Sequence, residues 1–268
     1  MSHIGSAKFL RRMLPLGLAV GCLPAAAWSS PLDPAPPAAD APSQAHTRDT
    51  KFKLLLDGGI GFSIDYSESR TFQEFVETGS LTTSYTNKSG PGFLGGLEYA
   101  LTQHVGLRAA FSYMTRDGSA SWTGSFPHPL YFNQPRSASG DVTSLSYSET
   151  SVHLDAVFTT RAGPLDLSLF GGGSLIKVSA DLLGTPQKTE TYPFDQVTIT
   201  AVPTVSASDS PIGLNVGGGV DYRINQRFAV GAQGLFSRAK AKLPSPGGGT
   251  VEVDAGGFHV TGGLRIRF

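Results

Sequence analysis

Residues 52–66 read FKLLLDGGIGFSIDY, and every second residue of this stretch is apolar or glycine. The positions between them include Lys53, Asp57 and Asp65. A period of two is that of a β-strand, whose successive side chains point to opposite faces. The stretch therefore predicts a strand with one polar face and one apolar face, the latter formed by Phe52, Leu54, Leu56, Gly58, Ile60, Phe62, Ile64 and Tyr66.

The same alternation recurs in seven further segments. They are residues 93–101, 105–113, 151–159, 165–174, 212–223, 228–237 and 258–268. No residue on the apolar face of any segment carries a charge. The sequence therefore predicts eight amphipathic strands.

The connections between these segments alternate between short and long. Tight turns are expected at 102–104, 161–164 and 223–227, whereas 67–92, 114–151, 175–211 and 238–257 are long connections, parts of which extend the flanking strands. An even number of strands, with short turns at one end and long loops at the other, is typical of outer-membrane barrels. We therefore expect an all-β fold: a transmembrane, antiparallel, up-and-down barrel of eight strands, with short periplasmic turns, long extracellular loops and its apolar faces against lipid.

The turn positions also predict strand register, because opposite residues of an antiparallel hairpin point to the same face. With Leu101 opposite Val105, Glu98 lies opposite Arg108 on the polar face. The same arithmetic at the 223–227 turn sets Tyr222 opposite Phe228.

The N-terminal residues have the pattern of an export signal. Three basic residues, Lys8, Arg11 and Arg12, precede the apolar run 13–23, which is too short to anchor the chain in a membrane. Residues 28–50 are rich in Pro and Ala and predict a disordered periplasmic linker. We expect a signal peptide at 1–27, the linker at 28–50 and the barrel at 51–268, with Cys22 either lipidated or removed with the signal peptide.

Composition excludes several classes of function. The 21 Lys and Arg residues balance the 21 Asp and Glu residues, so no basic surplus favours nucleic acid as a partner. The single Cys supplies neither an internal disulfide nor a thiolate metal site, and no short element places two His and a carboxylate together. We expect no cofactor and no metal ion.

Three stretches resemble the small outer-membrane barrels of the OmpA-type and opacity-protein-like group. They are LFGGGS at 169–174, LNVGGGVDYRIN at 214–225 and GLRIRF at 263–268, and the resemblance covers about residues 51–268. It implies a cell-envelope protein in the outer membrane of a Gram-negative bacterium. It also implies that the terminal Phe268 is the signal read by the barrel assembly machinery.

An eight-stranded barrel encloses a space that side chains can just fill, so a wide pore is not expected. The polar faces place Asp57, Glu98, Arg108, Asp155 and Arg265 in this lumen. Because an unpaired buried charge is costly, we expect Glu98 to pair with Arg108 and Asp57 to pair with Arg265. The network either fills the lumen, which we favour, or forms a narrow gated ion path.

Hydrolysis would need a His, a nucleophile and an acid at hydrogen-bond distance. His128 lies in a long connection without a strand to hold such partners, and His153 and His259 point into the lumen, where a lipid cannot reach. We therefore expect no catalytic residue and no enzyme, with a rim-active lipid hydrolase as the lesser alternative.

The long connections remain as candidates for specific function, because loops vary without disturbing the barrel. Their candidate contact residues are Trp122, Phe126, Tyr131 and Phe132. Exposed aromatic side chains suit contact with host matrix, a partner protein or lipopolysaccharide, and they equally suit packing of the loops on themselves. We expect a non-enzymatic barrel with a structural or adhesin-like role, and a narrow gated channel as the alternative. The sequence identifies neither the ligand nor the oligomeric state.

Overall fold

The computed structural model describes residues 51–62 and 64–268, so the predicted signal peptide and linker lie outside the described residues. The strands are β1 (Phe52–Gly61), β2 (Ile64–Glu74), β3 (Glu77–Asn87), β4 (Gly90–Ala100), β5 (Val105–Phe126), β6 (Arg136–Ala162), β7 (Leu165–Leu183), β8 (Gln187–Thr189), β9 (Thr198–Ala201), β10 (Thr204–Asp209), β11 (Ile212–Arg223), β12 (Phe228–Pro244) and β13 (Thr250–Arg267). Within this part of the chain, no helix could cross a lipid bilayer.

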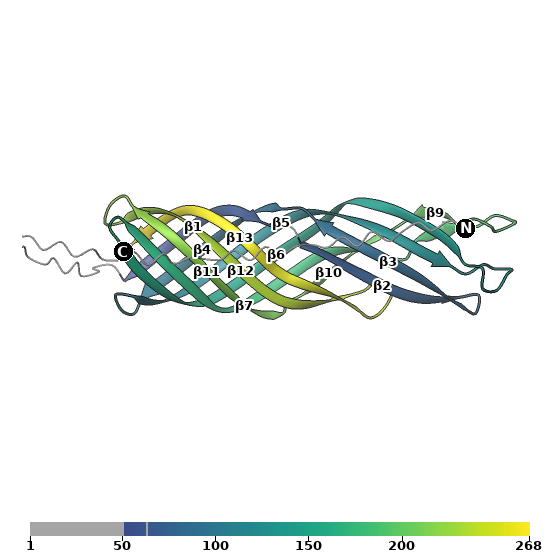
Figure 1. The fold of residues 1–268 in the computed structure, drawn as a ribbon, viewed down its shortest axis with the longest axis horizontal. Coiled ribbons are helices and arrows are strands. Elements are labelled where there is room, and N and C mark those ends of the chain that lie inside the picture. The colour runs from purple at the N-terminus through teal and green to yellow at the C-terminus, as the bar shows by residue number, and fades with distance from the viewer. Residues whose placement is uncertain (1–50, 63) are drawn as a thin grey trace, which may run out of the picture. The chain divides into compact units, whose positions relative to one another are not determined.

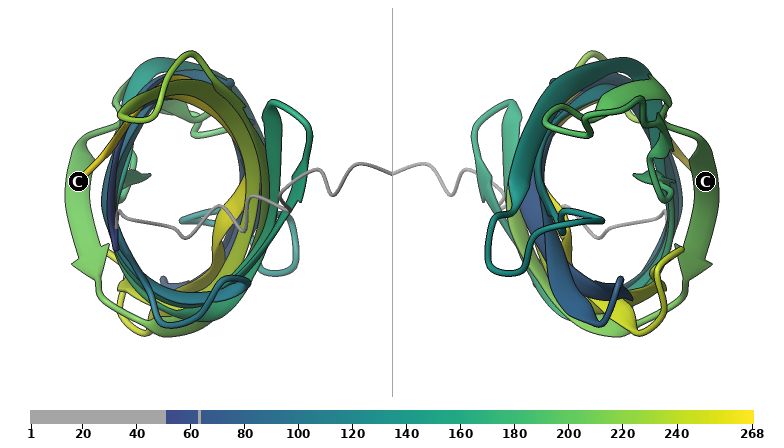
Figure 2. Two further views of the ribbon diagram at one scale, coloured as in Figure 1. Left: turned by 90° about the vertical axis from the view of Figure 1, so that its left-hand side faces the viewer. Right: turned by 90° about the vertical axis from the view of Figure 1, so that its right-hand side faces the viewer.

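Eight of these strands form a closed antiparallel ring. Its order is β1, β4, β5, β6, β7, β11, β12 and β13, and β13 pairs again with β1. Figure 2 shows the ring from both ends. The predicted eight-stranded up-and-down barrel is confirmed, and Glu98 lies opposite Arg108 as the turn position predicted.

The ring has the inside-out polarity of a membrane barrel. Outward side chains such as Leu56, Leu154 and Leu214 are exposed, whereas inward ones such as Asp57 and Asn215 are buried. Apolar side chains on the outside are stable only when lipid covers them. The outer surface of the ring is therefore the lipid-facing surface of a transmembrane barrel.

Aromatic rings mark both ends of this apolar surface. Near the short turns, the Phe52 ring lies 5.0 Å from Tyr99 and 5.9 Å from Phe268, measured between centroids. At the opposite end, Phe62 and Phe258 lie 5.5 Å apart. Aromatic side chains favour the two membrane interfaces, so these clusters delimit the membrane-spanning part. We call the cluster that includes Phe62 and Phe258 the outer aromatic belt.

Most of the residues predicted as long loops are strands. β5 and β6 stay paired as far as Phe126 and Arg136, well past the outer aromatic belt. β3 extends the wall beside β5, and β10 extends it beside β7. Figure 1 shows these strands continuing the barrel beyond the ring. The strand extensions expected within the connections 114–151 and 175–211 therefore take up much of their length; we call this part of the wall the extension.

Strand polarity reverses where the extension begins. On β12 the outward residues are apolar up to Phe236 and then become basic at Arg238, Lys240 and Lys242. The inward residues that alternate with these basic ones, Ala239, Ala241 and Leu243, are buried in an apolar core. The extension therefore has the inside and outside of a water-soluble barrel, because water replaces lipid as its surroundings.

The first predicted strand is in fact two. β1 ends at Gly61 and β2 begins at Ile64, and the apolar side of the chain changes face between them. Tyr66, predicted on the lipid side, packs instead against the core of the extension, where its ring stacks on Tyr85 at 4.6 Å. The prediction for Tyr66 is wrong because continuing the alternation of β1 past residue 61 assigns the residues of β2 to the opposite face.

The predicted register at the 223–227 turn is also wrong. Tyr222 lies opposite Val230 rather than Phe228. The side-chain oxygen of Asn225 accepts hydrogen bonds from the main-chain N–H groups of Arg227 and Phe228, each at 2.8 Å. This local side-chain bond closes the turn around residues 225–227, and it shifts the pairing by two residues.

Candidate functional site

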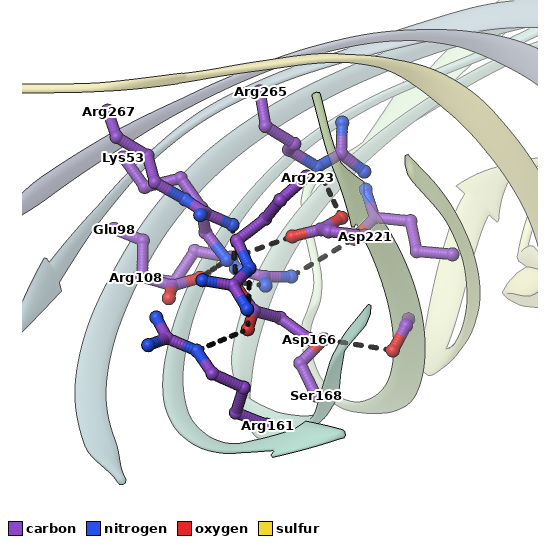
Figure 3. A network of polar contacts seen from close by, with 12 residues as sticks. Lys53, Glu98, Arg108, Arg161, Asp166, Ser168, Asp221, Arg223, Arg265 and Arg267 are labelled. Atoms are coloured by element: carbon purple, nitrogen blue, oxygen red, sulfur yellow. Dashed lines mark hydrogen bonds and ion pairs between the residues drawn. The ribbon is translucent and has the colours of Figure 1, made fainter. Parts of the chain in front are cut away.

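Charged side chains fill the lumen near the short turns (Figure 3). Lys53 Nζ lies 3.0 Å from a Glu98 carboxylate oxygen and 3.3 Å from an Asp221 oxygen. Arg108 donates to the same Glu98 oxygen at 3.0 Å. All four side chains are buried because alternate residues of β1, β4, β5 and β11 point inward.

Arg265 joins this network from β13. It pairs through Nη1 with Asp57, and its Nε donates to Asp221 at 3.0 Å. The structure thus brings together both of the ion pairs that the sequence predicts, Glu98 with Arg108 and Asp57 with Arg265. Every carboxylate named here has a cation beside it, so the network meets the condition for burying charge.

The network reaches across the lumen from one wall to the other. Arg108 donates from Nη1 to Gln233 Oε1 at 3.1 Å, and Gln233 Nε2 donates to Asp57 at 2.7 Å. β5, which carries Arg108, and β12, which carries Gln233, stand opposite each other in the ring. The Arg108 guanidinium also lies 4.2 Å from the centroid of the Phe170 ring. Side chains therefore fill this level of the lumen.

The fifth predicted network residue, Asp155, lies opposite Arg108 in the β5–β6 pairing, but it makes no ion pair within the described part of the chain. Its carboxylate accepts a hydrogen bond from Asn215 Nδ2 at 2.6 Å. Nearby, His153 contacts Ser112 at 3.1 Å and Ser174 at 2.7 Å through its two ring nitrogens. Among the described residues, no carboxylate contacts His153, so this layer lacks the His–acid pair of a hydrolytic site.

A third polar layer lies near the outer aromatic belt. Glu149 lies 3.2 Å from Arg116 and 3.8 Å from His259. Its other carboxylate oxygen accepts hydrogen bonds from Tyr147 at 2.6 Å and from the Gly256 main-chain N–H at 2.9 Å. β6 and β13, which carry Glu149 and Gly256, stand opposite each other, so this layer also crosses the lumen.

Most interior side chains of the extension are apolar above these layers, with a few buried polar residues such as Glu68 and Asn87 among them. Leu182, Leu243 and Val253 each have 0 % exposure. The Tyr85 hydroxyl accepts a hydrogen bond from the Leu183 main-chain N–H at 2.9 Å. Burial raises the pKa of Tyr85 to about 12, so its hydroxyl stays neutral at physiological pH. The apolar core thus contains no ionised tyrosine at this position.

Two of the four candidate loop contacts are wrong. Trp122 and Phe126 lie on β5 and are 4 % and 3 % exposed, because their side chains form part of the core of the extension. Tyr131 and Phe132 lie beyond the end of β5 and are 54 % and 72 % exposed. Of the four candidates, Tyr131 and Phe132 are the ones exposed to a partner.

His128 holds the segment that carries these two aromatics. It is buried, and its Nδ1 accepts hydrogen bonds from the main-chain N–H groups of Leu130 at 3.0 Å and Tyr131 at 3.2 Å. Its ring lies 4.9 Å from the Tyr131 ring. His128 therefore orders this connection, a structural role that a His between two prolines did not reveal in the sequence.

Ion pairs tie the outer rim together. Lys188 on β8 lies 2.5 Å from Glu74 and 2.9 Å from Glu190, and Arg136 lies 2.8 Å from Glu190. Burial raises the pKa of Glu190, but the hydrogen bonds from Lys188 and Arg136 outweigh it and hold that pKa below its ordinary value. In the residues that the structure describes, no group of three or more His, Cys, Asp or Glu is placed to hold a metal ion.

Comparison with known proteins identifies the family. The model of the outer membrane protein beta-barrel domain matches residues 35–265, most of the chain. A search of the curated proteins finds no match.

Solved structures of small barrels are similar at low identity. Neisserial surface protein A (NspA) is 15% identical, with a TM-score of 0.42, over 81% of this chain and 97% of that one. OprG from Pseudomonas aeruginosa is 12% identical, with a TM-score of 0.48, over 82% and 96%. The protease OmpT from Escherichia coli is 11% identical, with a TM-score of 0.41, over 83% and 98%.

Proposed function

Because the chain belongs to the outer membrane protein beta-barrel domain family, we propose that it is a non-enzymatic protein of the Gram-negative outer membrane whose extension contacts other surfaces. One observation carries this proposal: side chains occupy the lumen of the ring at successive heights, whereas the wall continues outward with a polar surface and exposed aromatics at its rim.

The occupied lumen argues against transport as the main role. Hydrogen bonds join opposite walls at the level of Arg108 and Gln233 and again at the level of Glu149 and Gly256. The apolar core of the extension follows, and an ion would have to lose its hydration to cross it. A lumen of this kind stabilises the barrel and leaves the outer surface for recognition.

The rim offers the features that recognition needs. Tyr131 and Phe132 are exposed on a segment that the buried His128 holds in place. An ordered aromatic side chain contributes contact area at a low cost in conformational entropy. We propose lipopolysaccharide and outer-membrane lipids as the partners of the outer wall, the assembly machinery as the partner of Phe268, and a host or partner surface for the rim.

A binding assay on intact cells tests the role of the rim. Cells that display the wild-type chain should adhere to surfaces coated with laminin, fibronectin or purified lipopolysaccharide. Cells that display the Tyr131→Ser/Phe132→Ser variant should lose this adhesion. Val76→Ser removes an exposed apolar side chain from a different rim connection and should leave binding unchanged. Equal binding by all three proteins, at equal surface levels, would leave only a structural role.

The gated channel remains the second candidate, because one lumen layer has polar atoms without partners. Among the described residues, Arg116 Nε and His259 Nδ1 are buried and make no hydrogen bond, which suits a hydrated path. Planar-bilayer recordings separate the two functions. Filling of the lumen predicts no openings from the wild type or from Glu98→Ala, whereas a gate predicts openings whose probability changes in the variant.

A further inference from the structure

The rim of the extension encloses a cavity of about 330 Å³. β2 supplies five of its eleven lining residues, Arg70 and Phe72 among them, and Leu81 and Phe126 come from β3 and β5. Thr185, Pro186, Lys188 and Gly247 complete the lining. Its volume falls at the lower end of the range of small-molecule sites, about 300–1,000 Å³.

The floor of this cavity is apolar. The Phe72 and Phe126 rings lie 5.7 Å apart, and Leu81 packs with Phe126 in the core of the extension. Leu81 and Phe126 are both nearly fully buried, so the barrel wall fixes their positions. A ligand that enters the cavity therefore meets a preformed apolar surface.

Arg70 gives the cavity an unmatched positive charge. Its Nη2 donates to the Gly184 carbonyl oxygen at 2.6 Å, which fixes the guanidinium. Its Nη1 is buried, and no acceptor for it exists among the described residues. No described carboxylate forms an ion pair with Arg70 either. A buried charged donor without an acceptor is unfavourable, so an anion would satisfy it.

The other cation of the cavity is already neutralised. Lys188 lies between Glu74 at 2.5 Å and Glu190 at 2.9 Å, and its ammonium also lies 5.5 Å from the Phe126 ring centroid. A ligand anion would therefore be drawn to Arg70 rather than to Lys188. This asymmetry predicts the orientation of the ligand: acidic group on Arg70, apolar part over Phe72 and Phe126.

The connection between β12 and β13 leaves room for the guanidinium. Ser245 bonds Glu68 on β2, which brings the connection against the cavity. At Gly247, a side-chain Cβ would lie 2.8 Å from Arg70 Cδ and 3.1 Å from Nη1. Glycine at this position therefore lets the connection lie directly against the Arg70 side chain.

We propose that this cavity binds a small organic anion, a carboxylate carrying a short aromatic or aliphatic group. The carboxylate would bond the Arg70 guanidinium, whose Nη1 has no acceptor among the described residues, and the apolar group would lie on Phe72, Leu81 and Phe126. This goes beyond the surface role proposed above, since the site is a pocket within the rim, and its test does not depend on Tyr131 or Phe132.

Calorimetric titration of the full-length protein in lipid nanodiscs tests the proposal. The probes are 3-phenylpropionate and its neutral amide, 3-phenylpropanamide, which have nearly the same shape. The acid should bind about 10-fold tighter or more, because a charged acceptor makes a stronger hydrogen bond to the guanidinium than a neutral amide does. Arg70→Gln should abolish this preference, and Arg70→Lys, which keeps the charge, should retain part of it.

Two further variants separate the parts of the site. Phe72→Ala should weaken acid and amide alike, since it removes apolar contact from both. Arg238→Gln makes the same chemical change on the outer face of β12 and should alter neither affinity. Equal affinities of the wild type for acid and amide, no saturable binding at millimolar acid, or equal effects of Arg70→Gln and Arg238→Gln would overturn the proposal. Heat-modifiable gel mobility checks that each variant is folded.

Discussion

Arg265→Met should be among the most destabilising single substitutions in the barrel. Arg265 is 1 % exposed and forms ion pairs with both Asp57 and Asp221. Its replacement by Met therefore removes a cation from beside each of these two buried carboxylates. Asp221 keeps Lys53 at 3.3 Å, whereas Asp57 keeps only neutral donors such as Gln233 at 2.7 Å. Removing one partner of a buried ion pair costs about 3–5 kcal/mol, and we expect that loss here.

Arg238 provides the matched control. It pairs with Asp254 at 3.1 Å, but both side chains are more than half exposed on the outer face of the extension. Exposed ion pairs contribute little, because water and salt screen them. Arg238→Met therefore makes the same chemical change and should leave the free energy of unfolding unchanged within experimental error.

Urea unfolding of the refolded protein in lipid vesicles measures the difference. Trp122, in the core of the extension, reports unfolding by fluorescence, and heat-modifiable gel mobility reports the loss of the barrel. Asp57→Asn combined with Arg265→Met should recover part of the loss, which gives a coupling energy for the pair. The reasoning would be refuted if Arg265→Met lowered the free energy of unfolding no more than Arg238→Met does.

Three further substitutions test other parts of the structure. Leu243→Asp should destabilise the barrel strongly because Leu243 is fully buried, whereas Lys242→Asp, one residue away on the outside, should be tolerated in the same urea assay. Leu154→Arg places a charge on the lipid-facing surface and should cost about 2–4 kcal/mol if it lies near the bilayer midplane, measured by the same unfolding. The pKa of Glu190 is below its ordinary value, so its contribution is complete at neutral pH and lost as the pH falls below 4.5. Protection factors for hydrogen exchange at 187–201, which correct for the intrinsic pH dependence of amide exchange, should therefore fall in acid, and Glu190→Gln should remove this decrease.

The alternation of side chains was enough to locate the eight strands of the ring. Each strand separates residues such as Leu56 and Asp57 onto opposite faces, and lipid on one side enforces this separation over the whole span. Only parts of the long connections were expected to be strand, although the extension alternates as clearly as the ring. Its Lys240 and Lys242 point outward and Ala241 and Leu243 inward, so the sense of the pattern is inverted, and Ser- and Thr-rich outer faces resemble loops in composition.

The lumen network was only partly predictable. Glu98 and Arg108 are neighbours across one hairpin, so the turn position sets their contact. The contacts of Arg108 with Gln233 and of Lys53 with Asp221 join strands that are not neighbours. Such contacts depend on the tilt and stagger of the closed barrel, which fix the relative heights of distant strands, and no local pattern encodes these quantities.

The change of solvent along the barrel also explains where the ring opens. Inside a membrane every main-chain polar group needs a partner in the protein, so β1 and β13 stay paired until the outer aromatic belt, where Phe62 N–H still bonds the Phe258 carbonyl oxygen at 3.0 Å. Beyond this point β2 pairs with β3 alone among the described strands, since water can satisfy its other edge. The seam between β2 and β13 is thus confined to the extension. An unpaired strand edge is tolerated only in the extension, where water can bond its main-chain groups. The strand with this edge, β2, also carries Arg70, which lines the rim cavity.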